Sequence, residues 1–301
     1  MFLSTGCRLS KVGVIKLLID GSTKLFLLLG NPVSHSLSPL LHNAAFKALG
    51  LNCVYLAATV EQEALPQAVA GLRALKVGGA NITAPYKEAV MAHLDDLAPP
   101  AQLIRSVNTV VNREGRLYGD STDGPGFILA LREAGPPDLL DEPVMIVGAG
   151  GAARAVAFSL ASEGAAVFVA NRTAARAVEL VELLRRNASL KEGAAVEWHP
   201  QALRRCWESC RTMVYCLPGD SAAVAEALGF SSCRGRYFFD LRYHPPRNAL
   251  MRRFQEQGGT AYNGKGMLLW QAALSFKQFS GREAPLEEMR RALGGSELPG
   301  V

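Results

Sequence analysis

The chain alternates between short apolar runs and longer segments in which apolar residues recur at helical spacing. Short apolar runs bounded by glycine or polar residues are typical of buried strands, and apolar residues three or four apart indicate amphipathic helices. This alternation predicts an α/β fold with parallel strands. Strands are predicted at residues 26–29, 54–58, 78–83, 107–111, 117–119, 144–147, 165–170, 197–198, 214–217 and 237–241. Helices are predicted at residues 39–49, 61–75, 85–94, 127–132, 151–163, 175–184, 249–257, 267–279 and 287–293.

Length and composition allow two packed domains, since the chain has 301 residues of which 49% are hydrophobic. The formal net charge of +5 is dispersed along the chain, so we expect no nucleic-acid partner. There is no uncharged apolar run of about eighteen residues, and the N-terminal apolar run has no cleavage site after it. We therefore expect no membrane span, no signal peptide and a cytoplasmic protein. Residues 1–24 lack strong features and are interpreted as an extension.

The six cysteines form no Cys-x-x-Cys pair. Cys206 and Cys210 are four residues apart with His199 upstream, but no second ligand pair follows. Because structural zinc sites need four ligands, we interpret these cysteines as reduced thiols and expect no metal.

One stretch, residues 144–173, has the sequence pattern of a dinucleotide-binding unit. An apolar run is followed by Gly148, Gly150 and Ala153, which gives the spacing Gly-x-Gly-x-x-Ala, and then by an amphipathic segment. The first glycine permits the tight turn, the second lets a pyrophosphate approach the backbone, and the alanine allows close helix–strand packing. The anion would bind the free N–H groups at the helix N-terminus. A tight structural loop is the alternative.

The end of the next predicted strand indicates which cofactor is used. Asn171-Arg172-Thr173 follows Ala170, where an NAD enzyme would carry an acidic residue for the ribose hydroxyls. An acid would repel a 2′-phosphate, whereas an arginine pairs with it. The sequence therefore predicts NADP in preference to NAD, the alternative being a solvated arginine.

Hydroxyl and polar residues cluster where predicted strands end. Ser36 and Ser38 flank a predicted helix N-terminus, which suits a carboxylate, although Ser38 as a simple N-cap explains the pattern equally well. Asn81, Thr83 and Lys87 follow another strand, and ligands of α/β sheets bind at the carboxyl ends of strands. We expect a small-molecule site there.

Two further polar residues complete the candidate set. Asn108 is a polar residue inside an apolar run, and Asp123 stands before a predicted helix. Asp before a helix is commonly an N-cap, which is the alternative to a functional role for Asp123. As an ammonium, Lys87 can act as a general acid toward a developing alkoxide.

Seven motifs, in order, resemble the shikimate dehydrogenase family, and the similarity extends from about residue 24 to residue 281. The motifs are Gly-Asn-Pro-Val-Ser-His-Ser-Leu-Ser-Pro (30–39), Asn-Ile-Thr-Ala-Pro-Tyr-Lys (81–87), Val-Asn-Thr (107–109), Ser-Thr-Asp-Gly (121–124), Gly-Ala-Gly-Gly-Ala-Ala-Arg (148–154), Asn-Arg-Thr-Ala-Ala-Arg-Ala (171–177) and Met-Leu-Leu-Trp-Gln-Ala (267–272). The resemblance implies a two-domain α/β protein: a substrate domain (1–123 plus 259–301, including C-terminal helices) and a Rossmann-type NADP-binding domain (124–258).

The resemblance also implies an activity, the NADPH-dependent reversible reduction of 3-dehydroshikimate to shikimate, by a monomer or homodimer. It implies catalytic roles for Lys87 and Asp123. Residues implied to bind substrate are Ser36, Ser38, Asn81, Thr83, Asn108, Tyr243 and Gln271. Residues implied to bind the cofactor are Gly148, Ala149, Gly150, Gly151, Ala152, Asn171, Arg172, Thr173, Arg176, Leu241 and Gly264.

The chain departs from the family pattern mainly at residues 215–220, Tyr-Cys-Leu-Pro-Gly-Asp, where the family usually has an Asn-Ala-Thr-type loop. Smaller departures are Ser121 in place of Asn and Phe279 in place of Trp. We therefore expect lower turnover or an altered substrate range, as in a quinate-type paralogue or a weakened NADP-binding paralogue. A glutamyl-tRNA reductase-like protein is disfavoured, because Cys53 lies in an apolar strand without a nearby basic partner in sequence.

Overall fold

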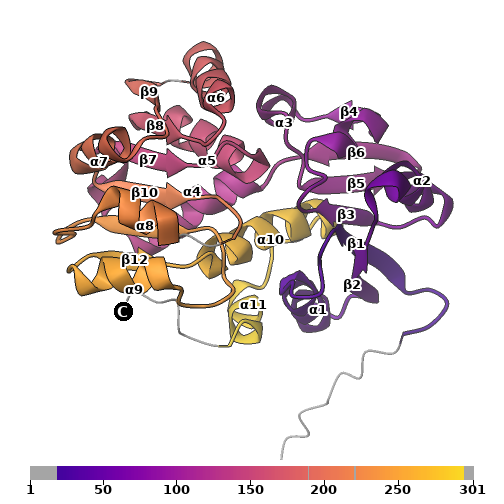
Figure 1. The fold of residues 1–301 in the computed structure, drawn as a ribbon. Helices are drawn as coiled ribbons and strands as arrows, with labels where there is room; N and C mark the ends of the chain where they lie inside the picture. Colours follow the sequence, from indigo (N-terminus) through magenta and orange to yellow (C-terminus); the bar gives the residue numbers. More distant parts are fainter. Residues whose placement is uncertain (1–18, 189, 220–221, 295–301) are drawn as a thin grey trace, which may run out of the picture.

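The computed structural model describes residues 19–188, 190–219 and 222–294. The predicted extension up to residue 18, Cys7 and Asp220 lie outside these residues. Two six-stranded sheets, each flanked by helices, form two domains, and a long helix near the C-terminus lies between them (Figure 1). The predicted α/β class is therefore confirmed.

The first sheet is mixed and has the strand order β2-β1-β3-β5-β6-β4. β1 pairs in parallel with β2 and β3, whereas β5 runs antiparallel to β3 and forms a hairpin with β6. The strands are β1 (Lys24–Gly30), β2 (Cys53–Thr59), β3 (Gly79–Ile82), β4 (Asp96–Leu97), β5 (Thr109–Arg113) and β6 (Arg116–Asp120). The helices are α1 (Ser38–Ala48), α2 (Leu65–Ala74) and α3 (Pro99–Ile104), with 3₁₀ turns at Gln62–Ala64 and Ala89–His93.

The second sheet is parallel throughout and has the strand order β12-β11-β10-β7-β8-β9. Its strands are β7 (Val144–Val147), β8 (Val167–Ala170), β9 (Gly193–Val196), β10 (Thr212–Tyr215), β11 (Tyr237–Asp240) and β12 (Thr260–Tyr262). Helices α5 (Gly151–Ser162) and α6 (Ala174–Asn187) pack on one face. Helices α7 (Pro200–Ser209), α8 (Ala222–Leu228) and α9 (Ala249–Glu256) pack on the other. Burial on both faces explains the continuous apolar run of β7.

Two helices join the domains: α4 (Asp123–Ala134) and α10 (Lys265–Ser280). They approach closely because α4 carries Gly126, where an added Cβ would lie 2.6 Å from the backbone nitrogen of Gln271 on α10. Gly124 has the same role toward α5, with 2.4 Å to the carbonyl oxygen of Ala155. α10 then packs on the first sheet, and α11 (Leu286–Ala292) packs on α1. The C-terminal helices thus complete the first domain.

Sheet pairing bears on the domain limits expected from the sequence. Strand β12, residues 260–262, pairs with β11 and belongs to the second sheet. We therefore propose that the chain returns to the first domain at about residue 263 and not at residue 259. The first crossing, at residue 123, stays a prediction and coincides with the start of α4.

Two elements predicted from sequence are wrong. The segment after Pro85 is not a helix to residue 94: residues 84–88 form turns, and a 3₁₀ helix covers Ala89–His93. Lys87 therefore lies in a turn and not at a helix start. The strand expected at residues 197–198 is β9 (Gly193–Val196), whose glycine and small alanines gave no apolar signal.

Other elements were not predicted. Strand β12 is only three residues long, and α7 is polar over most of its surface with Leu203 and Trp207 buried. α3 begins with Pro99-Pro100, which resembled a connecting segment in sequence although proline suits the first turn of a helix.

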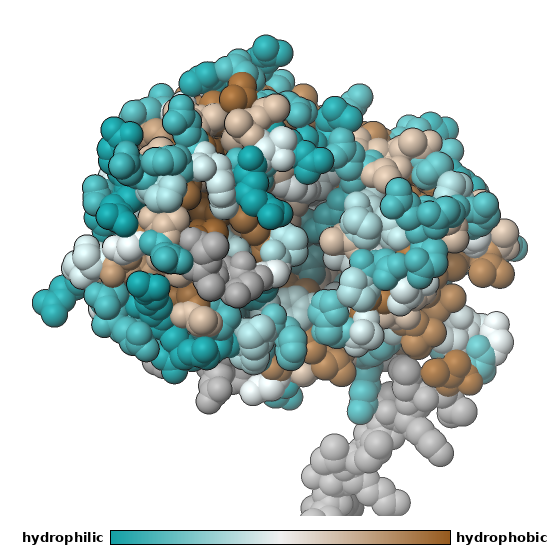
Figure 2. All heavy atoms as spheres, viewed as in Figure 1, coloured by the Kyte–Doolittle hydropathy of each residue, from teal (hydrophilic) through white to brown (hydrophobic). Residues whose placement is uncertain are grey.

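The face in Figure 2 is largely hydrophilic and is hollowed between the two domains. Among the residues that the structure describes, no helix combines the length and the apolar character needed to cross a membrane.

Candidate active site

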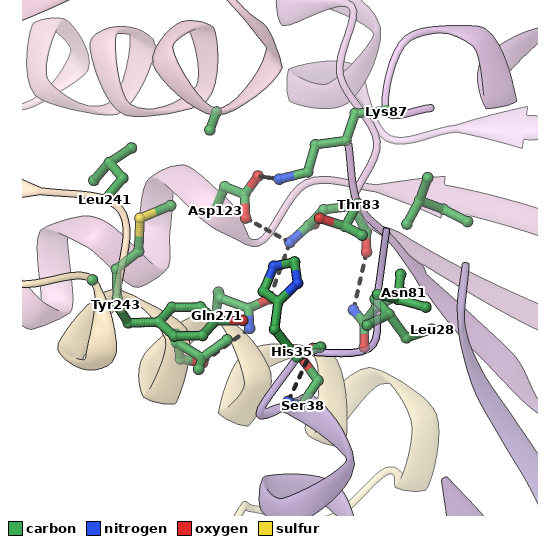
Figure 3. A pocket seen from close by; sticks show the side chains of 18 of the residues that line it. Leu28, His35, Ser38, Asn81, Thr83, Lys87, Asp123, Leu241, Tyr243 and Gln271 are labelled. Atoms are coloured by element: carbon green, nitrogen blue, oxygen red, sulfur yellow. Dashed lines mark hydrogen bonds and ion pairs between the residues drawn. The ribbon is translucent and has the colours of Figure 1, made fainter. Parts of the chain in front are cut away.

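A cavity of about 180 Å³ lies between the domains, at the carboxyl ends of strands of both sheets (Figure 3). Its walls contain the residues predicted to bind substrate, together with part of the predicted cofactor set. The predicted residues that line it are Ser36, Ser38, Asn81, Thr83, Lys87, Asn108, Asp123, Ala152, Leu241, Tyr243, Gly264 and Gln271. His35 and Met267 also line it, and neither was predicted as a site residue from sequence.

Lys87 and Asp123 both line the cavity and point toward one another (Figure 3). Lys87 Nζ lies 2.5 Å from Asp123 Oδ2, with the two side chains 18% and 5% exposed. Asp123 is the first residue of α4 and makes no side-chain capping bond, since the N-cap is Thr122. The N-cap interpretation of Asp123 is therefore wrong. The largely buried ion pair at a helix N-terminus leaves the lysine as a partly exposed cation facing the cavity.

Asn108 connects this pair to the helix between the domains. Its Nδ2 donates to Asp123 Oδ1 (2.9 Å), Thr122 Oγ1 (2.9 Å) and Gln271 Oε1 (3.2 Å). Its Oδ1 accepts a hydrogen bond from the backbone N–H of Thr122 at 2.7 Å. The polar residue inside an apolar run thus fixes the orientation of the Asp123 carboxylate.

Asn81 belongs to the same polar network and is 5% exposed. Tyr55 Oη donates to Asn81 Oδ1 at 2.8 Å, and Asn81 Nδ2 donates to Ser275 Oγ at 2.9 Å. Ser275 lies on α10, one turn after Gln271, and gave no signal in sequence. His42 stacks on Tyr55 with ring centroids 4.3 Å apart. Neither nitrogen of this buried histidine has a hydrogen-bond partner among the described residues, and burial lowers its pKa to about 3.

The serine-rich loop before α1 faces the cavity. Helix α1 starts at Ser38, its N-cap is Leu37, and no side chain caps it. The capping interpretation of Ser38 is therefore wrong. Ser36 Oγ accepts a hydrogen bond from the backbone N–H of Ser38 at 3.2 Å, which leaves the Ser36 hydroxyl proton free to donate. Thr83 lies opposite at the end of β3 (Figure 3).

The glycine-rich turn after β7 has the geometry expected of a dinucleotide site. Gly148 has φ +124°, a conformation that favours glycine, and Gly150 faces open space, where an added Cβ would meet nothing within 4 Å. An added Cβ at Gly151 would lie 2.8 Å from Ser106 Oγ and 3.3 Å from Lys87 Cβ. The turn therefore packs directly against the segment that carries the lysine.

The segment after β8 exposes two cations. Arg172 and Arg176 are exposed at the start of α6, where a 2′-phosphate would be expected. Asn171 is buried, and its Nδ2 donates to the carbonyl of Thr173 at 3.0 Å, so its side chain shapes this turn.

Arg154 on α5 was not singled out from sequence. It is buried, pairs with Glu179 at 3.4 Å and lies 3.8 Å from Glu88, the residue after Lys87. It therefore joins the helix of the glycine-rich turn to both α6 and the first domain.

Three segments of the chain match family models. The shikimate dehydrogenase substrate binding domain matches residues 28–110, shikimate / quinate 5-dehydrogenase residues 129–195, and the shikimate 5′-dehydrogenase C-terminal domain residues 264–293. Over 277 residues the chain is 39% identical to the shikimate dehydrogenase (NADP(+)) of Carboxydothermus hydrogenoformans. The alignment covers 92% of this chain and 98% of that protein. The chain belongs to the shikimate dehydrogenase family. The predicted resemblance is confirmed.

A further relative and a solved structure of the family are similar to this chain over nearly the same length. The shikimate dehydrogenase (NADP(+)) of Methanopyrus kandleri is 42% identical over 280 residues, covering 91% of this chain and 96% of that protein. The structure of shikimate 5-dehydrogenase from Thermus thermophilus in complex with NADP(H) and shikimate superimposes with a TM-score of 0.76. It is 36% identical and covers 90% of this chain and 98% of that one. The similarity thus includes both domains and the cavity between them.

Proposed function

We propose that this chain is an NADP-dependent shikimate dehydrogenase that reversibly reduces 3-dehydroshikimate to shikimate. The observation that carries the proposal is the Lys87–Asp123 pair, at 2.5 Å, between a hydroxyl-rich cavity and the glycine-rich turn. A cavity of about 180 Å³ fits a small polyhydroxylated acid. Membership of the family supports the same substrate and cofactor.

The first domain supplies the substrate contacts in this proposal. Ser36 and Ser38 donate hydrogen bonds to the substrate carboxylate, close to the N-terminus of α1. Asn81, Thr83 and Asn108, with Gln271 from α10, contact the ring hydroxyls. Tyr243, from the segment after β11, lines the same cavity and covers the substrate in this proposal.

The second domain supplies the cofactor site. The open space at Gly150 admits a pyrophosphate to the backbone N–H groups at the start of α5, and Arg172 with Arg176 pairs with the 2′-phosphate. These features fit NADP. The other contacts in the proposal come from Gly148, Ala149, Gly151, Ala152, Asn171, Thr173, Leu241 and Gly264.

The chain's own residues manage the proton in this reaction. A bound NADPH would supply the hydride to the carbonyl carbon. Lys87 then donates a proton from its ammonium to the alkoxide oxygen, so that the ketone becomes a secondary alcohol. In the oxidation direction Lys87 accepts that proton. Asp123 and Asn108 hold the ammonium in place, because the Asp123 carboxylate binds Lys87 through one oxygen and Asn108 through the other.

The test is a substrate comparison with the purified chain. Initial rates of NADP reduction are measured with shikimate, with quinate and with no substrate, at matched concentrations. We expect the highest kcat/KM with shikimate. A preference for quinate would indicate a quinate-type paralogue, and binding of NADP without turnover would indicate a weakened one. We also expect a cytoplasmic enzyme. It should be a monomer or a homodimer, and light scattering after gel filtration would distinguish these two states by molar mass.

A further inference from the structure

The order of strands in the second sheet predicts where the two halves of a bound dinucleotide would lie. That a dinucleotide binds here rests on the proposed function. The glycine-rich turn follows β7, and the exposed Arg172 follows the neighbouring β8. Since a dinucleotide lies across the crevice where the strand order reverses, its other half extends over the ends of β10 and β11. Leu241 and Tyr243, which come directly after β11, line the active cavity.

Arg242, between these two residues, contacts both strand ends. Its Nη2 lies 2.6 Å from Asp240 Oδ2 and its Nε 2.9 Å from Asp240 Oδ1, so the carboxylate is bound by two guanidinium nitrogens. Its Nη1 donates to the carbonyl of Gly219, in the loop after β10. The guanidinium carbon lies 4.8 Å from the centre of the Tyr215 ring. One side chain therefore holds both segments together.

The setting of these contacts makes them strong. Asp240 is fully buried, Tyr215 is 1% exposed, and the Arg242 side chain is 24% exposed. A two-point arginine–carboxylate pair that is withdrawn from water has a fixed geometry, and the planar guanidinium stacks on an aromatic ring as lysine does not. Asn248 Nδ2 also donates to Asp240 Oδ2, at 2.7 Å. The contacts around Asp240 thus also include Asn248, the N-cap of α9.

The loop after β10 also touches the glycine-rich turn. A Cβ added at Gly148 would lie 3.2 Å from the Cβ of Cys216 and 3.3 Å from Cδ2 of Leu217. This is the loop in which the chain departs most from its family. Displacement of the loop would therefore reach both the pyrophosphate site and the wall formed by residues 241–243.

We infer that Arg242 is a positioning residue that sets the nicotinamide side of the cofactor site. It acts through the loop at residues 215–219 and through its neighbours Leu241 and Tyr243. Loss of its contacts frees the wall against which the nicotinamide ring rests. The adenosine end, at Arg172, is on the far side of β7 and keeps its contacts.

The second domain offers a matched control in Arg211. Its Nη1 lies 2.7 Å from Asp138 Oδ2, its Nε donates to the carbonyl of Gly235 at 3.3 Å, and its guanidinium carbon lies 5.6 Å from the Tyr237 ring centre. Arg211 thus also contacts a carboxylate, a backbone carbonyl and an aromatic ring, although it binds Asp138 through one nitrogen and Asp138 is exposed. Arg211 directly precedes β10, however, and so lies at the amino-terminal ends of the strands, whereas the cavity lies at their carboxyl ends.

The experiment compares Arg242→Met, Arg242→Lys and Arg211→Met with the unmodified chain. Calorimetry measures binding of NADP⁺ and of 2′-phospho-ADP-ribose, which lacks the nicotinamide ring, and steady-state kinetics gives kcat and KM with shikimate. We expect Arg242→Met to lose about tenfold in NADP⁺ affinity and about tenfold in kcat, with 2′-phospho-ADP-ribose binding changed less than about twofold. Arg242→Lys should lie between Arg242→Met and the unmodified chain. Arg211→Met should lower the melting temperature and leave affinity and kcat unchanged.

Equal losses for both ligands, or an Arg242→Met variant that behaves like Arg211→Met, would overturn the inference. If Arg242→Met does not fold, Arg242→Lys is compared in the same assays, and unchanged NADP⁺ affinity and kcat in that variant would equally overturn it. The binding assays do not need turnover. An unmodified chain that is inactive with shikimate, while Arg242→Met still loses NADP⁺ selectively, would contradict the proposed function and leave this inference standing.

Discussion

Lys87, the proposed general acid, is the residue whose loss should affect chemistry most directly. Lys87→Ala removes the proton donor, so we expect kcat to fall by about 10²–10⁴ with little change in KM. Saturating steady-state kinetics with shikimate and NADP⁺ measures this. Lys277, which lies on α10 and forms an exposed ion pair with Glu283, is the control, because Lys277→Ala removes a lysine outside the cavity lining. Near-normal turnover in folded Lys87→Ala would remove Lys87 from the mechanism.

Cofactor choice is a second prediction at the residue scale. Arg172→Ala removes the proposed charge-assisted hydrogen bond to the 2′-phosphate, worth about 1.5–3 kcal/mol. That corresponds to a loss of roughly ten- to a hundredfold in affinity for NADPH, with NADH use unchanged. Fluorescence titration with each cofactor measures it. Arg186, 77% exposed near the end of the same helix, provides the control Arg186→Ala. A native preference for NADH would contradict the assignment.

Most of the candidate residues could be recognised in sequence because they lie beside a strand end or the glycine-rich turn. Gln271, which lies inside α10, was implied only by the family motif. Sequence could not choose between capping and catalysis for Asp123, since both place an aspartate at a helix start. The structure shows no side-chain cap, and the Lys87 and Asn108 contacts support the proposed catalytic role. Ser275 and Arg154 were missed because each lies inside a helix, where a polar residue is ordinary. Their importance comes from neighbours distant in sequence.

Among the elements, the contact between α4 and α10 depends on a missing side chain. Gly126→Ala would place a Cβ 2.6–2.8 Å from backbone atoms of Gln271, and backbone cannot move aside cheaply. We expect a loss of about 1–3 kcal/mol in unfolding free energy, as for overpacked cores. Urea denaturation measures this loss.

Gly71 on α2 is the matched control for Gly126. It is also helical, and an added Cβ there meets nothing within 4 Å. Gly71→Ala should therefore stabilise by about 0.5–1 kcal/mol, since it only restricts the unfolded chain. Equal effects of the two substitutions would contradict the role of Gly126 as a packing contact.

Elements with strong apolar periodicity were predicted within a few residues, as β7 and α9 show. The failures have physical causes. At Pro85 a proline after a strand looked like a helix start, but the chain needs a turn there to bring Lys87 to the cavity. Strand β9 consists of small residues, and its pairing with β8, not its hydrophobicity, makes it a strand.

At the scale of the whole molecule, His42 should make stability depend on pH. Burial lowers its pKa from 6.5 to about 3, so between these values the unfolded chain binds the proton and the folded chain does not. The free energy of unfolding therefore has its full value with respect to His42 above pH 6.5. It falls as the pH is lowered toward 3, by up to about 1.4 kcal/mol per pH unit. Urea midpoints from pH 7 to pH 4 measure this. In His42→Phe the unfolding free energy should fall less steeply with decreasing pH. If its dependence on pH is the same as that of the unmodified chain, His42 is not the group responsible.

The two C-terminal helices have a consequence for synthesis of the protein. Phe26 of β1 and Phe46 of α1 pack against Phe276 and Phe279 of α10, and Met289 of α11 completes the same buried cluster. On the ribosome, the first domain begins to emerge before the second but cannot close its core until α10 and α11 have been translated. The second domain, made in between, is free to fold earlier. The domain begun first is thus finished last, and a gene fragment ending near residue 258 would encode it without part of its core.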